Sequence, residues 1–155
     1  RARRVLEAMR AAGVSTTVVT YNTLIDACVT AGEPSEAMFG VLSALVIAGH
    51  RPDVVTYTTL LKHFSREGDV VAARWLMREM EGDGGVVPDV SAYNCLINAL
   101  SRQGLMAEAT AVLTRMAATG LPADVGTYGT LIDGFSRLDD VESADGLYRA
   151  LRGAG

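Results

Sequence analysis

The chain has 155 residues, is 49% hydrophobic and carries a formal net charge of −4 with a pI near 5.1. This length suffices for one compact domain or a short repeat array, and the apolar fraction can form a continuous core. No apolar run is long enough to span a membrane, and nonspecific nucleic-acid affinity requires an excess of Lys and Arg. The composition therefore argues against a membrane partner and against a generic polyanion binder.

The first predicted element is a helix within residues 1–17. Ala2, Val5, Leu6 and Met9 fall at the spacing of one helical face. The same register recurs in later segments of the chain, always behind a more strongly marked helix. We therefore predict that residues 1–17 are the second helix of an incomplete repeat.

A tyrosine marks each of the following helices. Tyr21, Tyr57, Tyr93 and Tyr128 are spaced 36, 36 and 35 residues apart, in the similar segments VVTYNTLID, VVTYTTLLK, VSAYNCLIN and VGTYGTLID. Apolar residues follow each tyrosine at plus three, plus four and plus seven, which is one face of an α-helix. A fixed period of this size is typical of a solenoid of stacked helical units.

A second apolar stripe follows each tyrosine helix after a polar break that contains Gly or Pro, residues that favour helix ends and starts. The clearest second stripes are Ala73, Leu76, Met77 and Met80; Ala109, Val112, Leu113 and Met116; and Ala144, Leu147, Tyr148 and Leu151. Each full unit then closes with a Gly-containing turn, a proline and an aspartate, which ends the second helix.

The units are predicted to span 18–53, 54–89 and 90–124, with partial units at 1–17 and 125–155. Two full units have an extra residue. In 54–89 we place it in the glycine-rich loop 81–85. In 18–53 its place stays open between a bulge in the second helix, with Gly40 as a candidate, and a longer turn. Neither end has the polar face of a capping repeat, so we expect a fragment of a longer array. The predicted fold is all-α, a right-handed α-solenoid of stacked helix-turn-helix repeats whose first helices line the concave side.

No residue pattern predicts catalysis or metal binding. Cys28 and Cys95 lie on expected helices, and we interpret them as reduced core residues rather than a disulfide framework. His50 and His63 lack partners at metal-ligand spacing, and the glycines near residue 84 lack the Lys-Ser/Thr of a phosphate loop. We therefore expect no enzyme activity, no cofactor and no small-molecule substrate.

These repeats resemble the pentatricopeptide repeat family in its plain 35-residue form. Residues 20–53 follow the family pattern VTYNTLID…AG…EA…M…G…PD almost word for word, and the other units follow it recognisably. The rival tetratricopeptide repeat carries Trp and Leu-Gly signals near the start of its first helix, and these are absent. The resemblance implies helical hairpins that each address one base of single-stranded RNA.

The resemblance also implies which residues contact the base. The residue after the tyrosine would contact its edge, assisted by the last residue of the unit, which gives the pairs Asn22 with Asp53, Thr58 with Asp89, and Asn94 with Asp124. The family associates Asn–Asp with uracil and Thr–Asp with guanine, so units 18–53, 54–89 and 90–124 should prefer 5′-U-G-U-3′. Helix capping by the aspartates is the alternative explanation for any single unit, and recurrence in three units favours base contact.

Two further positions carry implied roles. The residue two before each tyrosine would hold the base between neighbouring units, and it is Val19, Val55, Ser91 and Gly126. The residue nine after the tyrosine would face phosphate, and Arg66, Arg102 and Arg137 comply while Thr30 does not. An Arg near a helix C-terminus also suits the helix dipole. Gly129 follows the last tyrosine, so we assign unit 125–155 no nucleotide.

By resemblance, we expect a soluble, nuclear-encoded protein of a plastid (chloroplast) or mitochondrion, with single-stranded RNA as its partner. Such proteins act in transcript stabilisation, splicing, processing or translation. The alternative is a protein-interaction scaffold docked to organellar RNA-processing or ribosomal proteins, or within a transcription complex. The acidic pI and the departures in the last unit favour that alternative.

Overall fold

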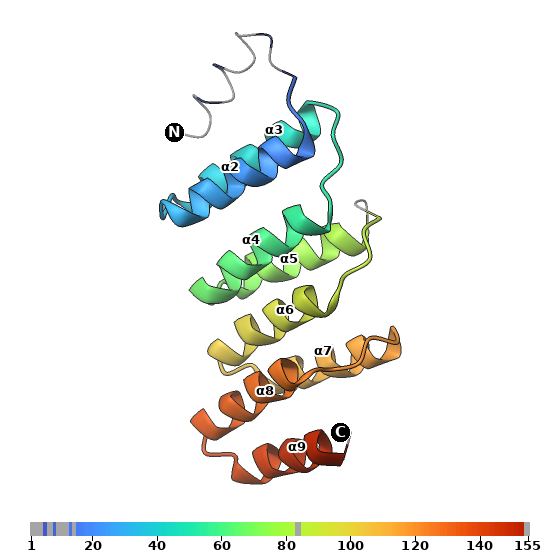
Figure 1. Ribbon diagram of the computed structural model, residues 1–155. Coiled ribbons are helices and arrows are strands. Elements are labelled where there is room, and N and C mark those ends of the chain that lie inside the picture. Colours follow the sequence, from blue (N-terminus) through green and yellow to red (C-terminus); the bar gives the residue numbers. More distant parts are fainter. Residues whose placement is uncertain (1–4, 6–7, 9–12, 14, 83–84, 154–155) are drawn as a thin grey trace.

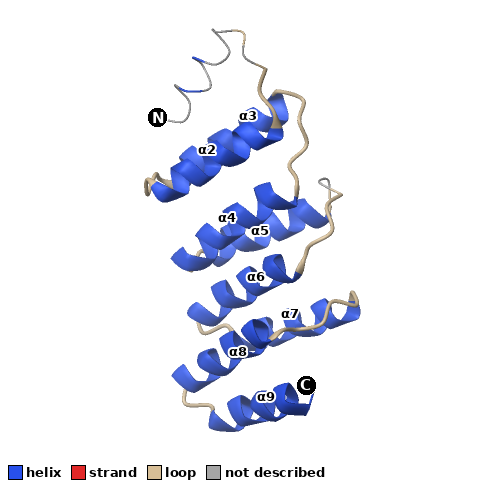
Figure 2. Ribbon diagram, in the orientation of Figure 1, coloured by secondary structure: helices blue, strands red, loops and turns tan. Residues whose placement is uncertain are grey.

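The computed structural model describes residues 5, 8, 13, 15–82 and 85–153 (Figure 1). Within these residues the secondary structure is helical and contains no strand (Figure 2). The helices are α2 (Val18–Thr30), α3 (Ser35–Ile47), α4 (Val54–Glu67), α5 (Val70–Glu81), α6 (Val90–Arg102), α7 (Met106–Ala118), α8 (Val125–Arg137) and α9 (Val141–Gly153). None of these described helices has the length and apolar character needed to cross a membrane. The all-α prediction is confirmed, whereas most of the helix expected within 1–17 lies outside the described residues.

The helices form hairpins that stack along one direction. α2 packs on α3, α4 on α5, α6 on α7, and α8 on α9, and the first helices α2, α4, α6 and α8 contact one another in succession. α5 and α7 also contact the first helix of the next hairpin, α6 and α8 respectively. Figure 1 shows the resulting ladder of hairpins from the N-terminal to the C-terminal end. The predicted solenoid is therefore confirmed, and its first helices form one continuous layer.

The repeating sequence sets where each first helix begins. α2, α4, α6 and α8 start at the first residues of the expected units, and the aspartate before each of the last three is its N-cap. One carboxylate oxygen accepts a hydrogen bond from the backbone N–H three residues later, at 2.8 Å for Asp53, 2.8 Å for Asp89 and 2.7 Å for Asp124. These bonds satisfy backbone N–H groups that would have no partner at an uncapped helix N-terminus. The capping role considered for these aspartates is thus real.

The two apolar stripes of each hairpin meet in a shared core. The stripes of α4, α5 and α6 are fully enclosed, as in Leu60, Phe64, Leu76 and Ile97. Cys28 and Cys95 are buried and free, as predicted. Burial raises the pKa of Cys95 to about 11, so its thiol stays neutral and is a poor nucleophile.

The extra residue of unit 18–53 lies in the turn between its helices, so Gly40 as its site is wrong. α3 is an unbroken helix around Gly40, and the turn 31–34 is longer than the corresponding turn 103–105. The buried stripe of α3 shows the same shift, because it begins at Met38, one position later than the alanines that start the other second stripes. In unit 54–89, α5 ends at Glu81 before the long connection 82–89, of which residues 83–84 lie outside the described part.

Candidate functional site

Two of the three predicted base-contacting pairs are joined by a hydrogen bond. Asn22 Nδ2 donates to Asp53 Oδ1 at 3.1 Å, and Asn94 Nδ2 donates to Asp124 Oδ1 at 3.2 Å. In both pairs the asparagine is half-buried on a first helix, while the aspartate is exposed at the start of the next first helix. The pair therefore connects two consecutive hairpins.

A threonine that the sequence analysis did not single out completes each pair. Thr56 Oγ1 lies 2.6 Å from Asn22 Oδ1 and 2.8 Å from Asp53 Oδ1, and it accepts a hydrogen bond from the Asp53 N–H at 3.2 Å. Thr127 repeats this arrangement around the second pair, at 2.6 Å, 2.9 Å and 3.2 Å. Both threonines are fully buried. We refer to each set as an Asn–Asp–Thr network.

The middle pair is built differently. Thr58 is only 9% exposed, and its hydroxyl donates to the Val54 carbonyl at 2.5 Å. Within the described residues no hydrogen bond joins Thr58 to Asp89, whose side chain caps α6 through the Ala92 N–H. Ala92 occupies the position of Thr56 and Thr127, so this unit lacks the network hydroxyl. The structure brings Asn22 to Asp53 and Asn94 to Asp124 but leaves Thr58 and Asp89 unlinked.

The networks favour ionised aspartates. Burial alone would raise the pKa of Asp53, but hydrogen bonds from Thr56 and Asn22 outweigh it and hold that pKa below its usual value. Hydrogen bonds from the Thr127 N–H and hydroxyl lower the pKa of Asp124, and Asn94 adds to the effect against a smaller contribution from burial. Both carboxylates are therefore charged at neutral pH and act only as acceptors.

The predicted base-holding positions lie beside these networks. Val19 is 71% exposed and Val55 is 56% exposed, although both belong to helices whose other face is core. Ser91 is half-buried, and Gly126 is so close to the second network that an added Cβ would lie 3.2 Å from Asp124 Oδ1. The apolar contact available to a base therefore decreases from the first unit to the third.

An open groove of about 680 Å³ runs across α4, α6 and the start of α8. Its lining comes only from first helices and their caps: Lys62, Ser65, Arg66, Val90, Ser91, Asn94, Cys95, Asn98, Asp124, Gly126 and Thr130. It unites five predicted site residues with Lys62 and Asn98, which the sequence analysis did not select. The size and the mixed polar and basic lining suit a nucleobase with its phosphate.

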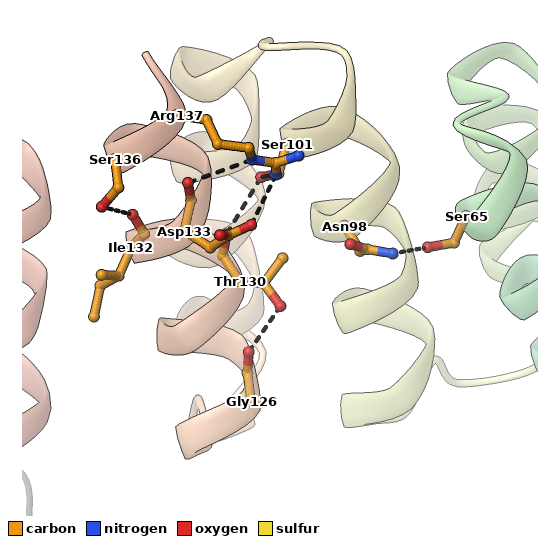
Figure 3. Close-up of polar contacts among 9 residues, drawn as sticks. All are labelled: Ser65, Asn98, Ser101, Gly126, Thr130, Ile132, Asp133, Ser136 and Arg137. Atoms are coloured by element: carbon orange, nitrogen blue, oxygen red, sulfur yellow. Dashed lines mark hydrogen bonds and ion pairs between the residues drawn. The ribbon is translucent and has the colours of Figure 1, made fainter. Parts of the chain in front are cut away.

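The three predicted phosphate-facing arginines differ in their surroundings. Arg137 forms an ion pair with Asp133 at 3.0 Å and donates to Ser101 Oγ at 3.2 Å (Figure 3). Among the described residues, neither Arg66 nor Arg102 forms an ion pair. Four residues before each arginine stands Lys62, Asn98 or Asp133, so only Arg137 has an acid within reach on its own helix. Arg66 and Lys62 thus form the strongest positive patch in the groove.

Side-chain hydrogen bonds between hairpins link the first helices α4, α6 and α8. Asn98 Nδ2 donates to Ser65 Oγ at 2.7 Å, and Ser101 Oγ donates to the Thr130 carbonyl at 3.2 Å (Figure 3). Each bond joins one first helix to the next. No group of three or more His, Cys, Asp or Glu that could hold a metal ion occurs in the part of the chain that the structure describes.

The fold is similar to those of solved proteins. Over 97% of its length the chain superposes on the crystal structure of PPR10 from maize with a TM-score of 0.85 and 27% identity, covering 22% of PPR10. It also superposes on PPR10 in complex with an 18-nucleotide psaJ RNA element, with a TM-score of 0.82 and 27% identity over 99% of the chain, again covering 22% of that protein. The chain thus spans about a fifth of the PPR10 chain.

A more distant match extends the fold comparison. The PPR domain of Arabidopsis thaliana protein-only RNase P 1, solved in complex with tRNA, has a TM-score of 0.78 at 18% identity. The match covers 99% of the chain and 80% of that domain. At this identity the similarity shows a shared fold only.

Sequence comparison identifies the family directly. No curated protein sequence matches the chain. A family model described as "Pentatricopeptide repeat-containing protein" matches residues 2–113, and a model described as "PPR repeat family" matches residues 88–150. The chain belongs to the pentatricopeptide repeat family.

Proposed function

We propose that this chain binds single-stranded RNA sequence-selectively, one base per repeat, without catalysis or cofactor. The observation that carries the proposal is the Asn–Asp–Thr network, built twice with the same bonds on the layer of first helices. In the second copy it lines a groove that also contains Lys62 and Arg66. PPR10, which is bound to RNA in its solved complex, supports this proposal through its similar fold.

Hydrogen-bonding capacity supports the assignment of bases. In each network the Asn amide has one N–H and one oxygen lone pair left, which match the mixed donor and acceptor edge of uracil. Thr58 spends its proton on Val54 and can only accept, which suits the N–H donors on the edge of guanine. The family resemblance implies that bound RNA runs 5′ to 3′ along the protein from its N- to its C-terminus. In that orientation the three units would select 5′-U-G-U-3′.

The acidic pI does not conflict with this function, because the charge is unevenly placed. Lys62 and Arg66 face the groove, and Arg102 is exposed one repeat further along the same side. We propose Arg66 and Arg102 as phosphate contacts and expect a smaller contribution from Arg137, whose charge is neutralised by Asp133. An organellar transcript in a plastid or mitochondrion is the setting that we propose for such binding.

Salt dependence of RNA binding tests the proposal. Fluorescence anisotropy with a labelled single-stranded RNA should show affinity falling as salt rises, with a slope of about −0.7 per phosphate contacted. The Arg66→Ala/Arg102→Ala variant should bind more weakly and with a shallower slope, by about 0.7 per lost contact. Arg149→Ala is the matched control, because Arg149 lies on α9 and pairs with Asp145 at 2.5 Å.

Two results would contradict the proposal. Absence of RNA binding by the parent chain at low salt would favour the protein-interaction scaffold instead. Equal losses from the groove variant and from Arg149→Ala would show that any positive charge suffices and that the groove is not the binding surface.

A further inference from the structure

We propose that Thr56 and Thr127 are positioning residues that set the base preference of the repeat before their own. This inference rests on the proposed function and deepens it. Each threonine belongs to the helix of one unit but contacts the base-contacting asparagine of the preceding unit, at 2.6 Å in both cases. Base selection would then depend on three residues drawn from two repeats.

The groups around the threonine hydroxyl determine where its proton points. A threonine hydroxyl has one proton, and its oxygen already accepts the N–H of the aspartate. The aspartate oxygen also receives the Asn amide and the helix-capping N–H, whereas no other hydrogen bond to the Asn oxygen is present within the described residues. The shorter distance likewise runs to the Asn oxygen. We therefore assign the threonine proton to a shared hydrogen bond that reaches both oxygens, with the shorter contact to the asparagine.

This assignment fixes which way the amide faces. The carboxylate attracts the NH₂ group, and the threonine holds the oxygen on the other side, so rotation of the amide would break both bonds. One N–H and one lone pair then point to the base in a defined order. Without the hydroxyl, the asparagine keeps only the contact to aspartate, and its oxygen can turn away from the base.

The chain contains a natural comparison for this position. In unit 90–124, which follows the middle unit, Ala92 stands at the position of this threonine. Ala92 is fully buried, and the Ala92 N–H still donates to the capping Asp89 carboxylate at 2.8 Å. The fold therefore tolerates both alanine and threonine in this register. The preceding unit, 54–89, is also the one whose proposed base-contacting residue is not asparagine. That residue, Thr58, donates its hydroxyl proton to the Val54 carbonyl and needs no threonine partner.

The first experiment removes one hydroxyl. Binding of the chain is measured for four RNAs that differ only at the base facing Asn94. In Thr127→Ala the preference for uracil at that base should fall about threefold to tenfold, the worth of one hydrogen bond between neutral groups. Thr127→Ser, which keeps the hydroxyl, should retain the preference, and preferences at the other two bases should not change.

Thr20→Ala is the matched control. Thr20 occupies the same place on α2 and accepts from the Thr17 N–H at 3.2 Å, but no asparagine side chain contacts it among the described residues. Its removal should leave all three base preferences intact. Circular dichroism melts verify that each variant is folded.

The second experiment transfers the network to the middle unit. Thr58→Asn alone supplies the amide, and Thr58→Asn with Ala92→Thr supplies the amide and its hydroxyl partner. The double variant should prefer uracil over guanine at the middle base about threefold to tenfold more strongly than the single variant. Ala92→Thr alone should keep the preference of the parent.

The outcomes separate the two proposals. If the parent prefers uracil opposite Asn94 and Thr127→Ala keeps that preference unchanged, the positioning role is wrong while RNA base selection stands. Equal uracil preference in the single and double middle-unit variants would also overturn it. If the parent binds the RNAs with all four bases equally, both the base selection and the positioning role of the threonines are wrong.

Discussion

At the scale of the residue, one carboxylate serves both folding and the candidate site. Asp53 and Asp124 each cap a first helix and hold the proposed base-contacting asparagine of the preceding unit through the same oxygen. Capping and base contact, which the sequence presents as alternatives, are therefore compatible. Asp89, which has no hydrogen bond to Thr58 within the described residues, shows that the cap forms without the asparagine.

Acid should destabilise the fold partly through these two carboxylates. Their pKa values are lowered in the folded state, so their contribution to stability is present above the unfolded value, about pH 4, and is lost as pH falls through the folded values. Asp53→Asn/Asp124→Asn keeps a capping side chain but cannot titrate. Urea unfolding between about pH 6 and about pH 3 should therefore show a flatter pH dependence for this variant than for the parent.

Some slope should remain in the variant, because hydrogen bonds from Ser143 also lower the pKa of Asp140. An unchanged pH dependence in Asp53→Asn/Asp124→Asn would show that the networks do not stabilise the ionised forms. The measurement requires no RNA and therefore tests the geometry of the site independently of its function.

The sequence predicts the Asn–Asp pairs but not their third member. Residues about 30 positions apart can be paired by a repeat, because the period defines which positions are equivalent. Thr56 and Thr127 look like ordinary capping-box residues of the next helix, and only the distances between hairpins reveal their contact with asparagine. The available signal was the threonine before three of the four marker tyrosines, with Ala92 as the exception.

At the scale of the element, a glycine sets how closely α8 approaches its neighbours. An added Cβ on Gly134 would lie 2.3 Å from Ser101 Oγ and 2.6 Å from Met106 Sδ. The serine is held by bonds to Thr130 and Arg137 (Figure 3) and cannot easily move. The absence of a side chain at this position therefore lets α8 pack on the preceding hairpin.

Replacing this glycine should separate packing from helix propensity. Alanine favours a helix by about 1 kcal/mol over glycine, but overpacking at Gly134 should cost about 1–3 kcal/mol, so Gly134→Ala should lower the free energy of unfolding. Gly40→Ala on α3 is the control, since nothing lies within 4 Å of its added Cβ. That variant should gain stability in chemical denaturation, and a gain in both would contradict the close packing of α8.

The repeat period of the sequence predicted the helix positions, but it did not predict the register of the buried stripe on α3. Apolar spacing located both stripes of units 54–89 and 90–124, and their residues form the core. In unit 18–53 the glycine in α3 suggested a bulge, but Met38, Val41, Leu42 and Leu45 form a complete stripe shifted by one residue. Aligning that stripe, rather than searching for a weak helix position, would have placed the extra residue in the turn.

At the scale of the whole molecule, affinity for RNA should be limited because only three units are proposed to contact a base. Base contacts contribute about 1–3 kcal/mol each, and association itself costs several kcal/mol. We expect this chain alone to bind a short RNA with a dissociation constant between about 1 mM and tens of micromolar. Titration by NMR or anisotropy measures it, and nanomolar binding would reveal a contact surface beyond the one described above.

The order of bases along the stack is tested by comparing the binding of two RNAs. The chain is titrated with 5′-UGU-3′ and 5′-GUG-3′ in identical flanking sequences, which have the same length and charge and differ in which unit meets which base. We expect tighter binding of 5′-UGU-3′. A single change of its middle guanine to uracil should weaken binding by about tenfold, which is the lower part of the range for one base contact. Equal binding of both RNAs would contradict base selection by these units, because the paired residues would then cap helices without selecting bases.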